Sequence, residues 1–393
     1  MARTSRPHAG IAGAGVLGRL LAWRLAHAGW RVSVVDPAPD ALAPARGSLF
    51  HAPHAAGFTA AGMLSPLAEL DQAEPAVAAL GWRSLDLWQA IARRLPARAD
   101  APQGLVRRQD SLLLAHPSDL GAAQRVLARL EAARAQDPAW PAAQPLDAEA
   151  LQALEPALAP RLWGWRLPGE GQVLGPALLE ALAADAPGAA WHWGRRVTDV
   201  SPHRLTLDDG QGLNVDLAID ARGLGARPEA EAQAQTLSPS DPHATDPRPT
   251  LRGVRGEVVW LHAPGVPLQR PLRLLHPRHR VYLVPRPGDL VLLGASELDS
   301  EDRSPVSLRS AVELMAAAHS VIPELAEARI VHLEANLRPA LPDHRPWVQS
   351  APGWLAINGL FRHGWLLAPA LVEQALTGLG LPAFTPNQEA AHA

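Results

Sequence analysis

The chain of 393 residues contains no cysteine, and this absence excludes several kinds of chemistry. Without thiols there is no disulfide framework, no thiolate metal site, no cysteine nucleophile and no cofactor attached through cysteine sulfur. Lysine is also absent, so all 36 basic side chains are arginine. A Walker-type phosphate loop and a lysine Schiff base are therefore excluded as well. A protein without cysteine fits the reducing cytoplasm, which is the location that we expect.

The chain also lacks dense runs of one charge and long apolar runs. Its formal net charge is −3 and no basic cluster is present, so neither nucleic acid nor an anionic membrane surface is an expected partner. The first apolar run, residues 11–28, is interrupted by glycine and arginine, so we expect neither a signal peptide nor a membrane span. A hydrophobic fraction of 47% and a charged fraction of 19% are typical of a globular protein.

Motifs for metal binding and for hydrolysis are missing too. No HExxH motif and no GxSxG elbow occurs in the sequence, and the histidines that invite a metal interpretation are scattered. We therefore expect no metal site. These scattered histidines are His51, His54, His276 and His279.

The clearest motif lies at the start of the chain, where residues 11–36 have the pattern of strand, glycine turn, helix and strand. The three glycines of this turn permit a tight bend, close approach of a pyrophosphate and tight packing of helix on strand. Free N–H groups at the helix start suit phosphate, and an acidic residue ends the second strand, where a carboxylate can bind ribose hydroxyls. We predict a dinucleotide site, with a merely structural glycine turn as the alternative, and the motif alone does not separate FAD from NAD. The residues assigned to this site are Gly13, Gly15, Val16, Leu17, Gly18, Asp36 and Pro37.

Apolar periodicity predicts further elements along the rest of the chain. The segment 227–249 is rich in Pro, Ala, Ser, Asp and Glu, and we interpret it as an exposed connection. Residues 60–63 are a candidate for the start of a helix. Other helices are predicted over 77–95, 120–135, 308–319 and 364–376, strands over 112–115, 256–260, 281–285 and 290–294, and a hairpin around Asp209-Gly210.

Two side chains in the second half of the chain are candidate ligands for a carboxylate. Arg338 stands where a strand is expected to end, and a planar guanidinium makes two parallel hydrogen bonds to a carboxylate. Taken alone, an arginine in a surface salt bridge is the commoner interpretation. Tyr282 is the only tyrosine, and its hydroxyl suits the same ligand, although a half-buried strand tyrosine is the more ordinary alternative.

Several blocks of the sequence resemble the D-amino acid oxidase superfamily of FAD-dependent oxidoreductases, and most of all its glycine oxidase branch, which serves thiamine biosynthesis. The matching blocks follow one another in order over most of the chain. They are the glycine-rich opening, 60–66 (AAGMLSP), 253–257 (GVRGE), 281–286 (VYLVPR), 294–296 (GAS), 337–339 (LRP) and 361–369 (FRHGWLLAP).

The resemblance implies a cofactor, FAD bound non-covalently, and a role for each matching residue. Arg338 would hold the substrate carboxylate with help from Tyr282, and Arg362 would lie beside substrate and flavin. Val197 would contact the adenine through its backbone. The residues expected along the flavin ring are Ala61, Gly62 and Met63, and those expected at its pyrimidine edge are Leu360, Phe361, Arg362, His363, Gly364, Trp365 and Leu366.

The resemblance also implies an architecture of two intertwined domains, an α/β Rossmann-type FAD domain and an α+β substrate domain with a mixed or antiparallel sheet. We expect the FAD domain to contain residues 1–80, 146–226 and 330–393. The substrate domain would contain residues 81–145 and 252–329, with 227–251 as a flexible linker.

The implied activity is oxidative deamination of a small amino acid or secondary amine of the glycine, sarcosine and D-alanine class. A hydride would pass to flavin N5, the imine would hydrolyse, and oxygen or another acceptor would reoxidise the flavin. The alternatives are a D-amino acid dehydrogenase that uses a quinone or other acceptor, a non-catalytic flavin-binding module, and an NAD-dependent dehydrogenase. A homo-oligomer is left open.

Overall fold

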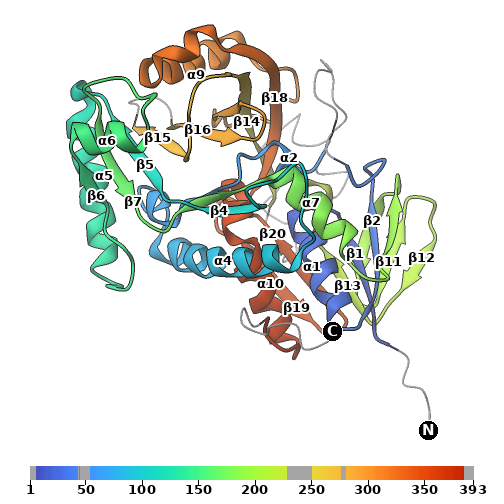
Figure 1. Ribbon diagram of the computed structural model, residues 1–393. Coiled ribbons are helices and arrows are strands. Elements are labelled where there is room, and N and C mark those ends of the chain that lie inside the picture. The colour runs from blue at the N-terminus through green and yellow to red at the C-terminus, as the bar shows by residue number, and fades with distance from the viewer. Residues whose placement is uncertain (1–5, 43, 45–53, 228–249, 276–279, 385–393) are drawn as a thin grey trace.

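The computed structural model describes residues 6–42, 44, 54–227, 250–275 and 280–384. Figure 1 shows that these residues form two lobes, each with its own sheet. The expectation of a Rossmann-type α/β unit combined with a second α+β unit is confirmed. The connection expected at 227–249 lies, apart from Arg227, outside the described residues.

The first sheet is the Rossmann-type sheet, and its six strands run in the order β19-β20-β13-β1-β2-β9. All neighbours are parallel except β19 and β20. The central strands are buried on both faces, and this explains their continuous apolar runs. Their bounds are β1 (His8–Ala12), β2 (Arg31–Asp36), β9 (Ala190–Trp193), β13 (Leu217–Asp220), β19 (Trp347–Ala351) and β20 (Trp354–Asn358).

Helices cover one face of this sheet and a small antiparallel sheet covers the other. The helices α1 (Val16–His27), α7 (Gly175–Ala184) and α10 (Gly364–Gly378) share one apolar core with α4 (Pro75–Arg94). The indole N–H of Trp88 on α4 donates to the carbonyl of Trp365 on α10 at 2.7 Å. On the opposite face lie β10 (Val197–Ser201), β11 (Arg204–Leu207) and β12 (Gly212–Asn214), and the last two form the predicted hairpin.

The second sheet has eight strands in the order β18-β14-β17-β16-β15-β5-β7-β6, and only β15 and β5 are parallel. Alternating residues of β5 enter two different cores: Leu112 and Leu114 pack with α9 (Leu308–Val321), and Leu113 and Ala115 pack with α5 (Leu120–Arg134). The strands are β5 (Ser111–Ala115), β6 (Gln144–Leu146), β7 (Trp163–Leu167), β14 (Arg252–His262), β15 (Leu272–Leu275), β16 (Arg280–Arg286), β17 (Leu290–Gly294) and β18 (Arg329–Ala340).

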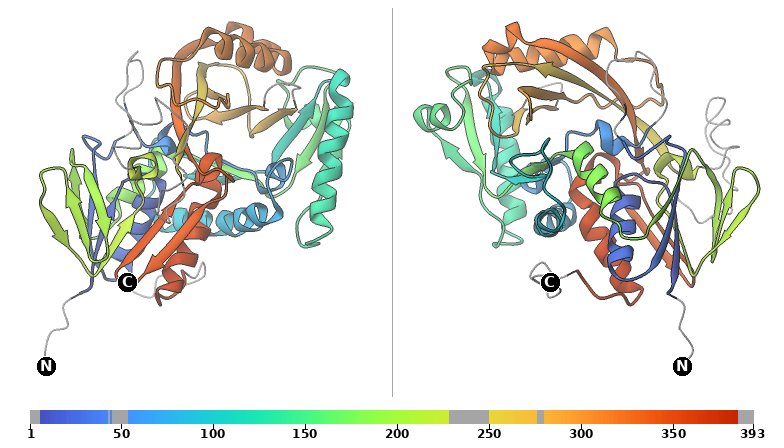
Figure 2. Two further views of the ribbon diagram at one scale, coloured as in Figure 1. Left: turned by 180° about the vertical axis from the view of Figure 1, so that it is seen from behind. Right: turned by 45° about the vertical axis from the view of Figure 1, so that its right-hand side comes forward.

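A third, three-stranded sheet lies between the two lobes, as the views in Figure 2 show. Its strands are β3 (Met63–Leu64), β8 (Gly171–Val173) and β4 (Val106–Arg108). The helix start considered at 60–63 is therefore wrong. The short helix α2 (Ala56–Thr59) ends before this point, and Gly62 has φ +64°. A Cβ at Gly62 would lie only 2.6 Å from the carbonyl oxygen of Val173, so only glycine fits here. Close approach to β8 has overridden the local helical pattern.

The strand pairing also departs from the expected division into domains at two places. Strand β7 lies within residues 146–226, and nearly all of β18 lies within residues 330–393. Both ranges were expected in the FAD domain, yet both strands pair within the second sheet. Strand β18 belongs to the second sheet because it forms a long ladder with β14, which runs from Arg252 opposite Ala340 to His262 opposite Arg329. Such pairing joins residues far apart in the sequence and leaves no local signal.

The remaining short elements connect these layers. They are α3 (Pro66–Glu69), α6 (Ala148–Leu154), η1 (Pro117–Asp119), η2 (Gly223–Ala226), η3 (Pro323–Glu327) and η4 (Phe361–His363). Among the helices in the described parts of the chain, none is both long and apolar enough to pass through a bilayer.

One carboxyl group is fully buried at the turn between β7 and β8. Glu170 accepts a hydrogen bond from the backbone N–H of Ala68 at 2.9 Å and another from the hydroxyl of Ser111. Burial raises its pKa to about 7, although these hydrogen bonds and the charge of Arg273 act in the opposite direction. The folded protein therefore favours the protonated acid.

This burial predicts a pH-dependent stability. Because the folded-state pKa lies above the unfolded one, the contribution is complete below pH 4.5 and is lost as the pH rises through about 7. The loss should approach about 3 kcal/mol. Chemical denaturation at pH 5 and pH 8 should show this decline, and Glu170→Gln should flatten it. An equal decline in both proteins would contradict the assignment.

Candidate active site

A cavity of about 710 Å³ lies where the two lobes meet. Its wall combines the start of α1, the segment 55–63, strands β14, β16 and β18, the loop 295–297 and the residues 358–366. This volume is in the range of sites for cofactors and other small ligands. The cavity brings together most of the residues singled out from the sequence, but Gly13, Gly18, Asp36, Pro37 and Val197 are not in its lining.

The start of α1 provides the first binding surface. Gly15 caps the helix without a side-chain hydrogen bond, no acidic residue lies in the first turn, and Gly15, Val16 and Leu17 line the cavity. Gly13 has φ +97°, and a Cβ on Gly18 would collide with the Gly13 carbonyl oxygen. The glycines therefore let helix and turn pack closely and leave free N–H groups at the positive end of the helix dipole, which fits a pyrophosphate.

The predicted acid is in place beside this turn. Both oxygens of Asp36 accept backbone hydrogen bonds, one from Ala14 at 2.6 Å and one from Ala38 at 2.8 Å, so the carboxylate fixes the glycine turn. Pro37 follows it on the surface, and Val197 is buried at the start of β10, where its carbonyl accepts from Arg222. These three residues lie outside the described lining of the cavity, so their contacts with a nucleotide stay predictions.

A second run of backbone approaches the cavity from the C-terminal part of the chain. Residues 360–366 all line it, and they include the 3₁₀ turn η4 and the start of α10. Gly359 has φ +72° and packs against Leu341, which sets the direction of this segment. Ala61, Gly62 and Met63 line the cavity as well. The mostly apolar side chains at these positions suit a flat ring such as a flavin.

Arg338 on β18 is half-buried at the cavity wall. Its guanidinium donates to the backbone carbonyls of Arg255 at 3.3 Å and Ser296 at 3.1 Å, and among the described residues no carboxylate lies within ion-pair distance of it. Burial lowers its pKa from the ordinary arginine value. Gly256 on β14 makes the position available, because a Cβ there would overlap the guanidinium. A half-buried cation that the described residues leave without an anionic partner is suited to an anionic ligand.

Tyr282 lines the same cavity from β16. Burial raises the pKa of its hydroxyl, and the nearby charge of Arg338 acts to lower it. Gly294 on the neighbouring strand leaves room for the ring, since a Cβ there would lie 2.5 Å from the Tyr282 oxygen. Tyr282 therefore remains a neutral hydrogen-bonding group close to Arg338.

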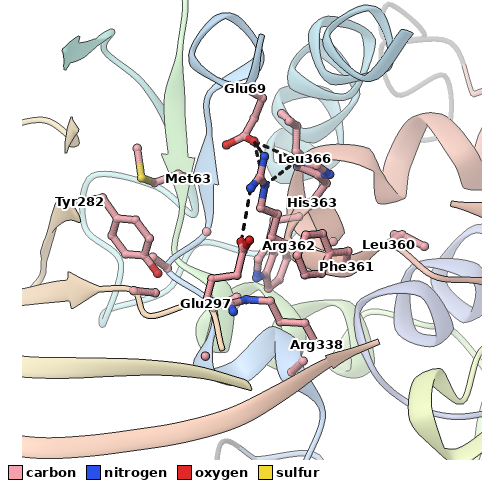
Figure 3. Close-up of a pocket in the computed structure, with 18 of the residues that line it drawn as sticks. Met63, Glu69, Tyr282, Glu297, Arg338, Leu360, Phe361, Arg362, His363 and Leu366 are labelled. Atoms are coloured by element: carbon pink, nitrogen blue, oxygen red, sulfur yellow. Dashed lines mark hydrogen bonds and ion pairs between the residues drawn. The ribbon is translucent and has the colours of Figure 1, made fainter. Parts of the chain in front are cut away.

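Arg362 also reaches the cavity, but carboxylates already surround it. Its guanidinium lies 3.1 Å from Glu69 and 3.3 Å from Glu297, as Figure 3 shows. Although burial alone would raise the pKa of Glu69, the charges of Arg273 and Arg362 and the hydrogen bond from His363 hold it well below its usual range. The charge of Arg362 is thus largely neutralised, and its direct contact with substrate stays a prediction.

Sequence reasoning did not identify three residues that shape this site. Gly256, Glu69 and Glu297 all fall in or next to the blocks that carry the family resemblance, yet nothing in the local pattern marked them. Their roles depend on contacts with Arg338 and Arg362, which come from strands and turns far away in the sequence. In the described residues, no cluster of three histidine, aspartate or glutamate side chains could hold a metal ion, and His51, His276 and His279 lie outside them.

Comparisons with known proteins agree with this geometry. The family model described as FAD dependent oxidoreductase (DAO) matches residues 8–374. A protein of Rhizobium etli named "Putative thiamine biosynthesis oxidoreductase ThiO" is 35% identical over 378 residues, which cover 95% of this chain and 97% of that protein. Glycine oxidase of Geobacillus kaustophilus is 26% identical over 97% of each chain. Its crystal structure matches 98% of each chain with a TM-score of 0.75.

The close contact between the Arg338 guanidinium and Gly256 can be tested by mutation. Gly256→Ala should push the guanidinium out of position and weaken the binding of a small carboxylate such as glycolate by about tenfold or more, which corresponds to about 1.4 kcal/mol. The change lies away from the start of α1, so the protein should still retain its cofactor. Titration of the purified protein with glycolate, followed by absorbance, measures the effect. Gly253→Ala on the same strand is a control, because its Cβ would face Leu337 and Glu301 and not Arg338.

Proposed function

This chain belongs to the family of FAD-dependent oxidoreductases, and we propose that it oxidises the C–N bond of a small amino acid or secondary amine. The substrate class that we propose is that of glycine, sarcosine and D-alanine. The similarity to glycine oxidase over nearly the whole chain supports this class. The name of the Rhizobium etli relative supports a further proposal, that the product serves thiamine biosynthesis.

The observation that carries the proposal is the state of Arg338. This half-buried guanidinium beside a cavity is bonded to carbonyl groups, and among the described residues no carboxylate pairs with it. A substrate carboxylate would supply the missing anion and form charge-assisted hydrogen bonds in a site of low dielectric. The same contact would fix the orientation of the α-carbon, because carboxylate and α-carbon are adjacent in an amino acid.

The remaining residues have roles in binding and orientation. Backbone N–H groups of residues 15–17 would hold the pyrophosphate of FAD, and Ala61, Gly62, Met63 and residues 360–366 would line its ring. When bound, FAD supplies the acceptor for the hydride that leaves the α-carbon. Tyr282 would donate its hydroxyl hydrogen to the substrate carboxylate beside Arg338. The buried walls would exclude water during this step, and water would then convert the product imine to an oxo acid and ammonia or an amine.

Oxygen is the electron acceptor that we propose, with peroxide as its product. A dehydrogenase that uses a quinone or another acceptor would retain the same substrate site. An oxygen electrode, compared with a dye-reduction assay, distinguishes the two. Turnover with the dye but without oxygen uptake would assign the protein to the dehydrogenases and leave the role of Arg338 intact.

The first test of the function is the visible spectrum of the purified protein, followed by anaerobic addition of glycine, sarcosine and D-alanine. We expect flavin absorbance that bleaches with at least one of them, because the substrate electrons have no other acceptor. Flavin bands that bleach with none of the three would contradict the proposed substrate class.

The second test replaces the carboxylate anchor. Arg338→Ala should raise the KM for the amino acid by about 100-fold, since a buried charged hydrogen-bonding pair contributes about 3 kcal/mol. Arg338→Lys should recover only part of this loss, because lysine lacks the planar fork. Retention of flavin absorbance in both variants is the control for folding. An unchanged KM would remove Arg338 from the substrate site.

A further inference from the structure

The wall of the substrate cavity carries nearly balanced charges. Three arginines, Arg273, Arg338 and Arg362, form one cluster in this wall with two glutamates, Glu69 and Glu297, and Arg125 and Asp71 line the cavity as well. Glu69 pairs with Arg273 at 3.2 Å and with Arg362 at 3.1 Å, and Glu297 pairs with Arg362 at 3.3 Å. Arg338 is the arginine of this set that has no ion-pair partner among the described residues. These five groups therefore have one positive charge in excess.

Glu297 differs from the other four groups in its surroundings. Its side chain is 46% exposed although it lines the cavity, whereas the side chains of Arg362 and Glu69 are 17% and 15% exposed. Glu297 therefore lies where the cavity meets solvent. Figure 3 shows its carboxylate between the guanidinium groups of Arg362 and Arg338. The neighbouring residue Ser296 accepts a hydrogen bond from Arg338 through its carbonyl, so this short loop contacts both arginines.

We propose that Glu297 restricts the enzyme to substrates with one carboxylate, by occupying Arg362 and by repelling a second carboxylate that approaches it. This proposal rests on the proposed function, in which the first carboxylate binds Arg338. Arg362 would otherwise offer a second guanidinium close to the first, and the cavity would then suit a dicarboxylic amino acid. With Glu297 in place, the second carboxylate would meet an anion at the position where it needs a cation.

The expected size of this effect follows from the exposure of Glu297. Solvent screens a half-exposed ion pair, so its removal changes binding far less than the loss of a buried pair would. The second carboxylate of a ligand is attracted by Arg338 and Arg362 and repelled by Glu297. We therefore expect Glu297 to change the affinity for a dicarboxylate, relative to a monocarboxylate, by about tenfold. Because the effect is electrostatic and near solvent, it should become smaller as the salt concentration rises.

The test uses a matched pair of unreactive ligands. Glycolate carries one carboxylate, and tartronate is glycolate with a second carboxylate on the same carbon. Both are titrated into the flavin-loaded protein at low salt, and the change in flavin absorbance gives each Kd. The ratio of the two Kd values is the quantity of interest, so a general change in affinity cancels.

Glu297→Gln keeps the shape of the side chain and removes its charge. We expect this variant to change the Kd ratio in favour of tartronate by about tenfold at low salt, and by clearly less at 0.5 M NaCl. The matched control is Asp299→Asn, which removes one charge two residues along the same loop, where the side chain is 84% exposed and pairs with Arg252. A parallel comparison of D-aspartate with D-alanine as substrates should show the same change in kcat/KM.

The outcomes separate this inference from the function on which it rests. An unchanged ratio in Glu297→Gln, or an equal change in Asp299→Asn, would overturn the role of Glu297. A ratio that changes equally at low and high salt would indicate steric exclusion and would also overturn it. If glycolate does not bind the unmodified protein at all, the carboxylate site at Arg338 fails, and with it the proposed function.

Discussion

Burial of the Arg338 guanidinium is the constraint around which the centre of this molecule is arranged. A charge in the interior loses its hydration, and carbonyl groups compensate only partly for that loss. Here the carbonyls of Arg255 and Ser296 accept its hydrogen bonds, and Gly256 leaves the space that its bulk requires. The ladder between β14 and β18 holds these groups in register along its whole length. The long pairing of two strands thus holds the guanidinium of Arg338 at the cavity wall, where the proposed substrate carboxylate would meet it.

The starts of two helices, one near each end of the chain, line the same cavity. The start of α1 and the segment that leads into α10 both present N–H groups to it, and each is directed by a glycine at positive φ, Gly13 and Gly359. Positive helix ends at one cavity suit a ligand that carries phosphates and a polar ring edge. Side chains of the second sheet then supply the specific charges. Under the proposed function, binding of the cofactor would depend mostly on backbone groups, and selection of the substrate on side chains.

The parts of this structure that could be predicted are those with local causes. The glycine turn, the hairpin at Asp209-Gly210 and the amphipathic helices have signals within a few residues, and the structure contains each of them. The local pattern made Arg338 and Tyr282 candidates and the family resemblance gave them a role, and both lie at one cavity. The pairing of β7 and β18, the extended chain at 60–63 and the neutralisation of Arg362 were not predictable in this way. Each depends on partners that the sequence separates widely, such as Val173 for Gly62 and Glu69 for Arg362.

The order of strands in the first sheet has a consequence for the synthesis of the protein. β1 lies between β2 and β13, and β13 pairs next with β20, so the centre of the sheet combines residues 8–12, 217–220 and 354–358. A ribosome makes these segments in a fixed direction at roughly 5–20 residues per second, so the first and the last of them are made tens of seconds apart. The glycine turn and its neighbour β2 are thus made early, β13 follows near the middle of the chain, and β20 and the segment 360–366 come last. Strands β1 and β2 can pair early, but β20 can join β13, and residues 360–366 can enclose the cofactor, only when nearly all of the chain has been translated.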